Sequence, residues 1–131
     1  NPIALHVRRT DYVTNSANHP PCTLEYYEEA LKHFDDDRNV IVFSDDPEWC
    51  NEQKLFSGDR FLISENEDNR VDLCLMTLCN DFIIANSSFS WWGAWLANRG
   101  KVIAPQRWFG TEGYTKDHNT KDVAPDEWTR L

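Results

Sequence analysis

The stretch "PIALHVRRTDY", residues 2–12, joins an apolar run to two adjacent arginines. The apolar run ends at Val7 and is typical of a short strand buried within a sheet. Arg8 and Arg9 follow it directly, and two neighbouring guanidinium groups repel each other and are costly to desolvate. We therefore expect an anion beside them, which is either a carboxylate of the chain itself or a bound ligand.

Strand and helix patterns alternate along the rest of the chain. Apolar runs predict strands at residues 2–7, 40–43, 60–64, 81–86 and 101–105. Helical spacing of apolar residues predicts helices at residues 23–34, 46–56, 69–79 and 88–100. Thr23 and Asp46 are good N-caps, Pro47 suits a first helical position and Gly100 suits a helix end. The segment after Trp108 is polar and mixed and has no clear pattern of a helix or strand.

This alternation predicts an α/β fold, with a Rossmann-like parallel sheet of about five strands and helices on both faces. With 131 residues the chain fits one domain with one core. Ligands of such sheets bind beyond the carboxyl ends of the strands. We therefore expect the groups that follow the strands to lie along one edge, namely "RRTDY", "SDD", "SENED" and "NSSFS".

Two expectations concern how the helices pack. The helix at residues 69–79 has three apolar residues along one face, Val71, Leu75 and Leu78. The segment "FSWWGAWLA" is apolar on all sides, as expected for a helix between a sheet and another layer. Its tryptophans invite a sugar-stacking role, but we expect at least two of the three to lie in the core: Trp91, Trp92 and Trp95.

A diphosphate is one candidate for the anion beside the arginines. Arginine offers a rigid fork of donors that suits phosphate oxygens. Ser87 and Ser88 open a helix, where free backbone N–H groups and the helix dipole favour an anion. The alternative is that an arginine pairs with Asp11 or Asp45 and that the serines only cap the helix. For the arginine pair together with the helix start, the residues favour phosphate.

Charge and composition exclude several classes of partner. The formal net charge is −9 and the sequence pI is about 4.8, which argues against nucleic acid and anionic membranes. No apolar run reaches roughly 18 residues and no signal peptide opens the chain, so we expect no membrane span.

The four cysteines lack CxxC spacing, which favours reduced thiols in a cytoplasmic protein. The "DDD" at residues 35–37 is expected to be a solvated turn, so no metal site is predicted.

Several motifs together resemble a known family. "HVRRTDY", "FSDD" and "NDFIIANSSFSWWGAWL", in this order and followed by "VIAPQRWF", resemble the bacterial α1,2-fucosyltransferases of glycosyltransferase family 11. The HxRRxD motif is also shared with α1,6-fucosyltransferases, and the resemblance covers residues 6–109. It implies use of GDP-fucose, inversion at the anomeric carbon, and no need for a metal or another cofactor. It also implies two facing Rossmann-like halves, the GT-B architecture.

The resemblance assigns a phosphate-binding role to two segments. One of Arg8 and Arg9 would hold the β-phosphate and help GDP to depart, while the other could be structural. Ser87 and Ser88 would donate hydrogen bonds to phosphate. Asn86, which precedes them, is included among the donor-binding residues.

The resemblance also implies roles for one histidine and four aspartates. His6 would line the guanosine pocket, or be a satisfied histidine at a strand end. Asp72 would accept guanine N–H groups, or only favour the start of its helix. Asp45 and Asp46 could contact the ribose or nucleoside, although Asp46 is also a good N-cap. Asp11 is the nearest candidate for the general base, or it orients the arginines and the base lies outside this chain.

Residues 1–131 are expected to form the donor-binding half of such an enzyme, with the acceptor-binding half absent. The expected function is transfer of fucose from GDP-fucose to a galactoside hydroxyl, with a glycan as acceptor. The alternatives are a related enzyme that uses another GDP-sugar, and a nucleotide-binding module without transferase activity. We expect a cytoplasmic location, with the inner membrane surface as an alternative, and a homodimer.

Overall fold

A six-stranded parallel sheet forms the centre of the computed structural model, which describes residues 1–110, 113 and 118–131. The strand order is β3-β2-β1-β4-β5-β6, and every neighbouring pair is parallel. The predicted α/β class and Rossmann-like parallel sheet are therefore confirmed, with one strand more than expected. The strands are β1 (Ile3–Val7), β2 (Val40–Ser44), β3 (Phe61–Ile63), β4 (Asp81–Ile83), β5 (Val102–Ala104) and β6 (Thr129–Arg130).

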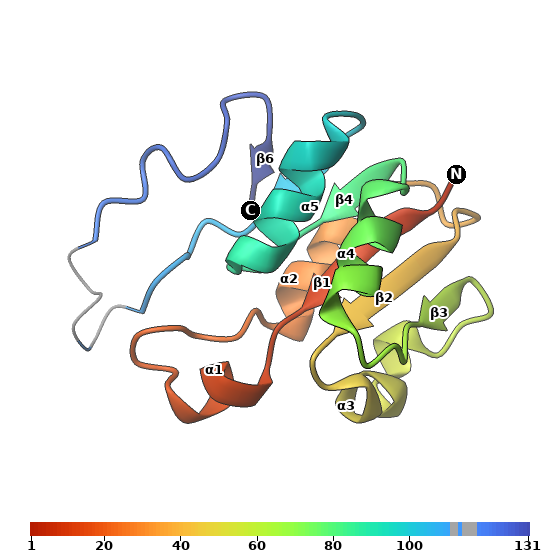
Figure 1. Ribbon diagram of the computed structural model, residues 1–131, viewed down its shortest axis with the longest axis horizontal. Coiled ribbons are helices and arrows are strands. Elements are labelled where there is room, and N and C mark those ends of the chain that lie inside the picture. The colour runs from red at the N-terminus through yellow and green to blue at the C-terminus, as the bar shows by residue number, and fades with distance from the viewer. Residues whose placement is uncertain (111–112, 114–117) are drawn as a thin grey trace.

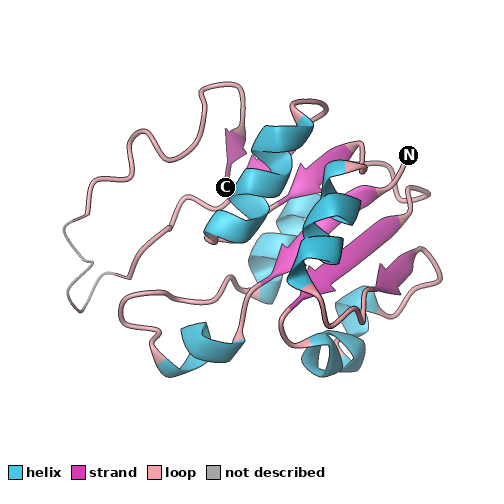
Figure 2. Cartoon of the chain, viewed as in Figure 1, coloured by secondary structure: helices cyan, strands magenta, loops and turns pink. Residues whose placement is uncertain are grey.

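Helices cover both faces of this sheet. Figure 1 shows α4 and α5 in front of the sheet and α2 behind it, and Figure 2 gives the same view by element type. Residues of α2 and α3 pack into one apolar core, and residues of α4 and α5 into the other. The helices are α1 (Thr10–Thr14), α2 (Leu24–Leu31), α3 (Pro47–Glu52), α4 (Asn69–Thr77) and α5 (Ser88–Ala97), with a 3-10 turn η1 (Lys54–Phe56) after α3.

The first strand lies at the middle of the sheet because it is apolar on both faces. All five residues of β1 are buried, and Ile3 pairs with Val40 of β2 on one side and Asp81 of β4 on the other. Ile3, Leu5 and Val7 enter the core under α2, whereas Ala4 enters the core under α4 and α5. Burial on both faces is the property that the run "PIALHV" predicted.

Side-chain caps predicted from the sequence fix the starts of α2 and α3. The Thr23 hydroxyl accepts a hydrogen bond from Tyr26 N, which begins α2. Asp46 Oδ1 accepts from Trp49 N and Pro47 is the first residue of α3, as predicted. Each cap satisfies one of the backbone N–H groups that a helix start leaves open.

Two elements were missed by the sequence patterns. The polar, mixed segment after Trp108 showed no clear pattern, yet it contains β6, in which Thr129 pairs with Ile103. Leu131 N also donates to Ala104 O at 2.9 Å and extends this pairing. The other missed element is α1, which is too short to show a helical period. Both depend on contacts with distant segments rather than on local pattern.

The apolar face expected for α4 does not pack. Val71, Leu75 and Leu78 are exposed, by 43%, 40% and 70%. The helix instead buries Asp72 and Met76, which lie one turn apart on an adjacent face. Met76 packs against α5 beside Gly93, whose missing side chain leaves room for it.

The expectation for the tryptophans of α5 is also wrong. Trp92 and Trp95 are each 49% exposed, and only Trp91 is held inward, where its Nε1 donates to Val123 O at 2.6 Å. The sheet and α4 cover two sides of α5, and the chain around Trp128 covers a third. The remaining outer side of this apolar helix faces solvent.

None of the helices in the described part of the chain is long and apolar enough to cross a membrane. All four cysteines are free thiols, as predicted. Burial raises the pKa of Cys22, Cys50 and Cys79 to about 11, so these thiols are neutral at pH 7.

The turn after α5 requires a glycine at position 100, and this requirement can be tested by substitution. Gly100 has φ +71, and a Cβ there would collide with the carbonyl oxygen of Asn80 and lie 2.8 Å from Asp81 Oδ1. We expect Gly100→Ala to lower the free energy of unfolding by at least about 1–3 kcal/mol, measured by urea denaturation. Gly58→Ala is the control, since its Cβ would meet only the Phe61 ring at 3.7 Å. Equal stability of the two variants would contradict the strain at Gly100.

Candidate functional site

A small pocket lies at the carboxyl ends of the central strands, where the fold predicts a ligand. Its volume is about 30 Å³. Of the residues that the sequence singled out, the structure brings His6, Arg8, Asp45 and Asp72 together in this pocket. The residues that line it are His6, Arg8, Phe43, Ser44, Asp45, Asn69, Asp72 and Phe89.

His6 lies in this pocket with one ring nitrogen unpaired. The residue is 4% exposed, and its Nδ1 has no hydrogen-bond partner among the described residues. Burial lowers the pKa of His6 to about 4, with the Asp45 charge opposing and the Arg8 charge adding to this shift. The imidazole is therefore neutral at pH 7. A buried polar atom without a partner costs free energy, so this nitrogen is well placed to be completed by a ligand.

Asp72 provides a buried carboxylate at the same pocket. It is 4% exposed, and its Oδ1 accepts from the Ser64 hydroxyl at 2.8 Å and from Asn66 Nδ2 at 3.2 Å. These bonds fix the carboxylate from one side. Its Oδ2 accepts no hydrogen bond from the described residues and is free to accept one from a ligand.

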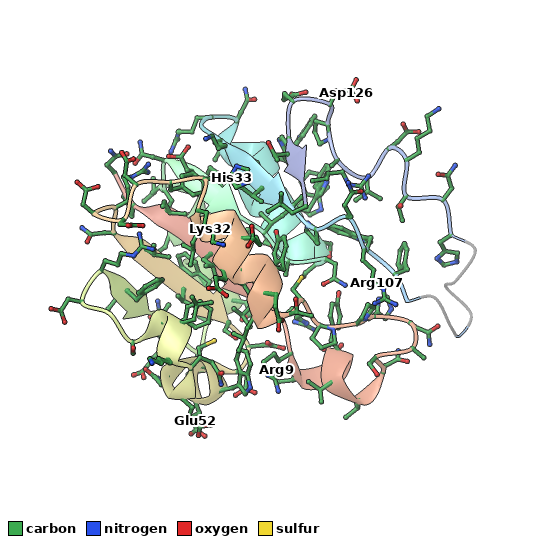
Figure 3. All side chains as sticks on the ribbon, turned by 180° about the vertical axis from the view of Figure 1, so that it is seen from behind. Arg9, Lys32, His33, Glu52, Arg107 and Asp126 are labelled. Carbon is green, nitrogen blue, oxygen red and sulfur yellow. The ribbon has the colours of Figure 1, made fainter. Side chains whose placement is uncertain are left out.

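The two arginines point to different places. Arg8 lines the pocket, whereas the guanidinium of Arg9 lies over the ring of Trp49, with Cζ 4.0 Å from the ring centroid. Figure 3 shows Arg9 between α1 and α3. The Nε of Arg9 also lies 3.5 Å from Asp46 Oδ2. Asp46 therefore caps α3 and pairs with Arg9, and neither residue lines the pocket.

Carboxylates of the chain supply the negative charge that the sequence required near the arginines. Arg8 Nη2 donates to Asp11 Oδ1 at 2.8 Å, and Arg8 Nε lies 3.5 Å from Asp45 Oδ2. The alternative that we held open, pairing of an arginine with Asp11 or Asp45, is what the structure shows. These contacts hold the Arg8 side chain at the pocket.

Asp45 organises the loop after β1. Its Oδ1 accepts from Arg9 N at 2.9 Å, and its Oδ2 accepts from Thr10 N and from the Thr10 hydroxyl at 3.1 and 2.6 Å. Burial acts to raise the pKa of Asp45, but these hydrogen bonds and the Arg8 charge together hold it below its ordinary value. Asp45 is thus an ionised carboxylate that positions the arginine loop.

The segment after β4 approaches the same loop. Asn86 is 2% exposed and its side chain is used internally, since Nδ2 donates to Pro20 O at 2.8 Å and to Trp108 O at 2.9 Å. Tyr12 donates its hydroxyl hydrogen to Asn86 O at 2.9 Å and joins the two loops. Ser87 is the N-cap of α5 and Ser88 is its exposed first residue. The structure therefore gives Asn86 a structural position. Ser87 is buried and its hydroxyl accepts from Phe89 N, so only Ser88 is exposed at the helix start, and neither serine lines the pocket.

Asp11 lies at the outer side of the site. Its side chain is 65% exposed and pairs with Arg8. This position suits either of the roles considered from the sequence, a base open to an incoming hydroxyl or an orienting partner of the arginine.

Four lining residues were not named as site residues from the sequence, and Ser44 is one of them. Phe89 follows the serine pair, Asn69 begins α4, and Phe43 ends the apolar part of β2. Ser64, which holds Asp72, was also missed. Phe89 and Ser64 belong to segments that we expected at the ligand edge, so position after a strand was the available signal. Phe43 could not be recognised in this way, because it lies within an apolar strand and resembles a core residue.

Within the described residues, no group of three or more His, Cys, Asp or Glu side chains is arranged to hold a metal ion. The "DDD" turn at residues 35–37 is exposed between α2 and β2, as predicted. A larger pocket of about 580 Å³ lies among the starts of the strands, beside Arg38, Ile41 and Leu62. It is at the edge opposite to the predicted ligand edge.

A parallel sheet with a polar pocket beyond the carboxyl ends of its strands defines a Rossmann-like α/β protein with a candidate ligand site at the usual edge. The chain belongs to glycosyl transferase family 11, whose family model matches residues 1–131. Its similarity to that family agrees with the motifs "HVRRTDY" and "NSSFSWWGAWL".

Two curated relatives from Escherichia coli match the whole chain. An α-1,2-colitosyltransferase is 41% identical over 142 residues, which cover 100% of this chain and 48% of that protein. The O-antigen biosynthesis glycosyltransferase WbnK is 36% identical over 141 residues, which cover 100% of this chain and 45% of that protein. The chain thus spans about half the length of these relatives. No solved structure matches the chain.

The low pKa of His6 predicts acid sensitivity of the fold. Between about pH 6.5 and pH 4, the unfolded chain protonates this histidine and the folded chain does not, so stability falls as the pH falls. A shift from 6.5 to about 4 corresponds to a loss on the order of 3 kcal/mol. We expect His6→Asn to lose less stability than the unchanged chain between pH 7 and pH 4.5, measured by urea unfolding. An equal loss in both would show that His6 is not buried in its neutral form.

Proposed function

We propose that this chain forms the donor-binding part of a GDP-fucose-dependent glycosyltransferase. The enzyme would transfer fucose to a galactoside hydroxyl in α1,2 linkage, with inversion and without a metal ion. The acceptor would be a glycan, and residues outside this chain would take part in binding it.

The observation that carries this proposal is the unpaired, buried Nδ1 of His6 next to the half-satisfied carboxylate of Asp72. Guanine presents a row of N–H donors on one edge, and a fixed carboxylate oxygen such as Asp72 Oδ2 can accept from them. A neutral imidazole can complete a further hydrogen bond to the nucleoside. Recognition of one base by buried polar groups is strong because a wrong base leaves them unpaired.

Arg8 and the start of α5 supply the phosphate contacts in this proposal. Arg8 lines the same pocket as His6, and its guanidinium is already held by Asp11 and Asp45. In this proposal the free N–H groups of the first turn of α5 and the hydroxyl of Ser88 would bind the anion at the favourable end of the helix dipole. Fixed donors of this kind need no reorganisation when negative charge grows on the diphosphate.

The reaction balances with these groups. The acceptor hydroxyl oxygen forms a bond to the anomeric carbon while the bond from that carbon to the β-phosphate oxygen breaks. GDP leaves with the bonding electron pair, and Arg8 and the helix start stabilise the charge more in the transition state than before it. The hydroxyl proton passes to a base, for which Asp11 is the candidate in this chain. Attack from the side opposite to the leaving group gives inversion.

A second candidate is transfer of a different sugar from a GDP-sugar. The relative with 41% identity is named for colitosyl transfer, so a family member with this degree of similarity can differ in its donor. A nucleotide-binding part without transferase activity of its own is the remaining alternative, because the chain spans about half of each relative.

Calorimetry with GDP, GDP-fucose, GDP-mannose and UDP, together with a transfer assay, separates these candidates. We expect tight binding of GDP and GDP-fucose and weak binding of UDP. Stronger binding of another GDP-sugar than of GDP-fucose would favour the second candidate. Binding of UDP as tight as that of GDP would refute the guanine site.

The arginines should differ in their effect on ligands. We expect Arg8→Ala to weaken GDP binding about tenfold or more and to leave guanosine binding nearly unchanged, because the lost partner is a phosphate. Isothermal titration with the two ligands measures this difference. Equal losses for GDP and guanosine would mean that Arg8 holds the loop rather than the phosphate.

Arg9→Ala is the matched control in the same loop. Arg9 packs on Trp49 and pairs with Asp46, so its removal should lower thermal stability without discriminating between GDP and guanosine. A selective loss of GDP binding in this variant would show that Arg9, and not Arg8, binds the phosphate.

Binding should not require a divalent cation. In the proposed site the positive charge at the diphosphate comes from Arg8 and the helix start. We expect titration of the chain with GDP to give the same affinity in a buffer with EDTA as in a buffer with Mg²⁺ or Mn²⁺. A strict need for either cation in the titration would contradict the proposal.

A further inference from the structure

Phe89 is a pocket residue with no part in the function proposed above. It is the second residue of α5, half-buried, and its ring centroid lies 5.2 Å from that of His6 at an interplanar angle of 40°. It therefore presents an aromatic surface directly beside the unpaired imidazole. Phe43, the other aromatic residue of the pocket, is fully buried and offers no such surface.

The pocket must open before it can accept a base. Its volume of about 30 Å³ holds little more than one water molecule, which is far less than a purine requires. A side chain that lines the pocket therefore has to move.

Three of the other lining residues are held in place, while Asn69 lies exposed at the rim. Arg8 is tied to Asp11 and Asp45, and Asp72 is tied to Ser64 and Asn66. His6 is 4% exposed and lies in the central strand. Phe89 is held only by apolar contacts at the rim of the α5 core, so a change of its side-chain rotamer breaks no hydrogen bond.

We infer that Phe89 turns to open the pocket and then stacks on the face of the guanine base. This inference rests on the proposed function, which it extends to the residue that binds the base face. An aromatic ring stacks on any base, so Phe89 contributes affinity while Asp72 and His6 select guanine. The ring also covers the edge hydrogen bonds of the base and shields them from water.

The test compares Phe89→Leu with Phe89→Tyr, using guanosine, GDP and inorganic pyrophosphate as probes. We expect Phe89→Leu to weaken binding of guanosine and GDP by about tenfold, while pyrophosphate binding stays unchanged. Phe89→Tyr should restore the affinity because it keeps the aromatic face. The preference for guanosine over adenosine should survive in both variants.

Trp92→Leu is the control, because Trp92 lies on the same helix, is 49% exposed and does not line the pocket. It should bind all three probes as the unchanged chain does. Thermal unfolding checks each variant, and Phe89→Met replaces the leucine variant if that variant does not fold.

The outcomes separate this inference from the function on which it rests. If the unchanged chain does not bind GDP, both are refuted. If it binds GDP and Arg8→Ala weakens that binding, but Phe89→Leu binds guanosine as before, only the stacking role of Phe89 is refuted. Equal losses for guanosine and pyrophosphate in Phe89→Leu would also refute it, since they would show that Phe89 merely supports the start of α5.

Discussion

The hydrogen bonds to the Asp45 carboxylate are the interaction on which the site depends. Val7 pairs with Ser44 across β1 and β2, so Asp45 emerges beside the turn that follows β1. There it accepts from Arg9 N, Thr10 N and the Thr10 hydroxyl. One charge directly after the neighbouring strand β2 therefore fixes the path of the loop. That path sends Arg8 into the pocket and Arg9 away from it, onto Trp49.

The polar groups at this edge fall into two sets. Asn86 and Asp45 have their polar atoms satisfied within the chain, and they hold the loops together. His6 Nδ1 is a buried atom that lacks such a partner, and Asp72 Oδ2 accepts no hydrogen bond from the described residues. Leaving buried polar atoms unpaired costs free energy that a fold otherwise avoids. In the pocket this cost falls on His6 Nδ1, which a ligand would complete.

The fold was predictable because its main elements follow from short-range pattern. The runs ending at Val7 and Phe43 are apolar on both faces, which only a covered parallel sheet can bury. Thr23 and Asp46 cap their helices by contacts within one turn. The missed strand β6 has no such signal, because its two residues become a strand only by pairing with β5.

The sequence by itself determined the class of fold, the edge where chemistry-bearing residues gather, and the family, since these depend on periodicity and on local motifs. Only the tertiary structure decided which arginine faces the pocket, because that choice depends on Asp45 and Trp49, which are distant in sequence from the pair. It also decided that α4 buries Asp72 and Met76 and leaves Leu75 and Leu78 exposed. A helical pattern shows that one face is apolar, but the neighbouring layers decide which face is covered.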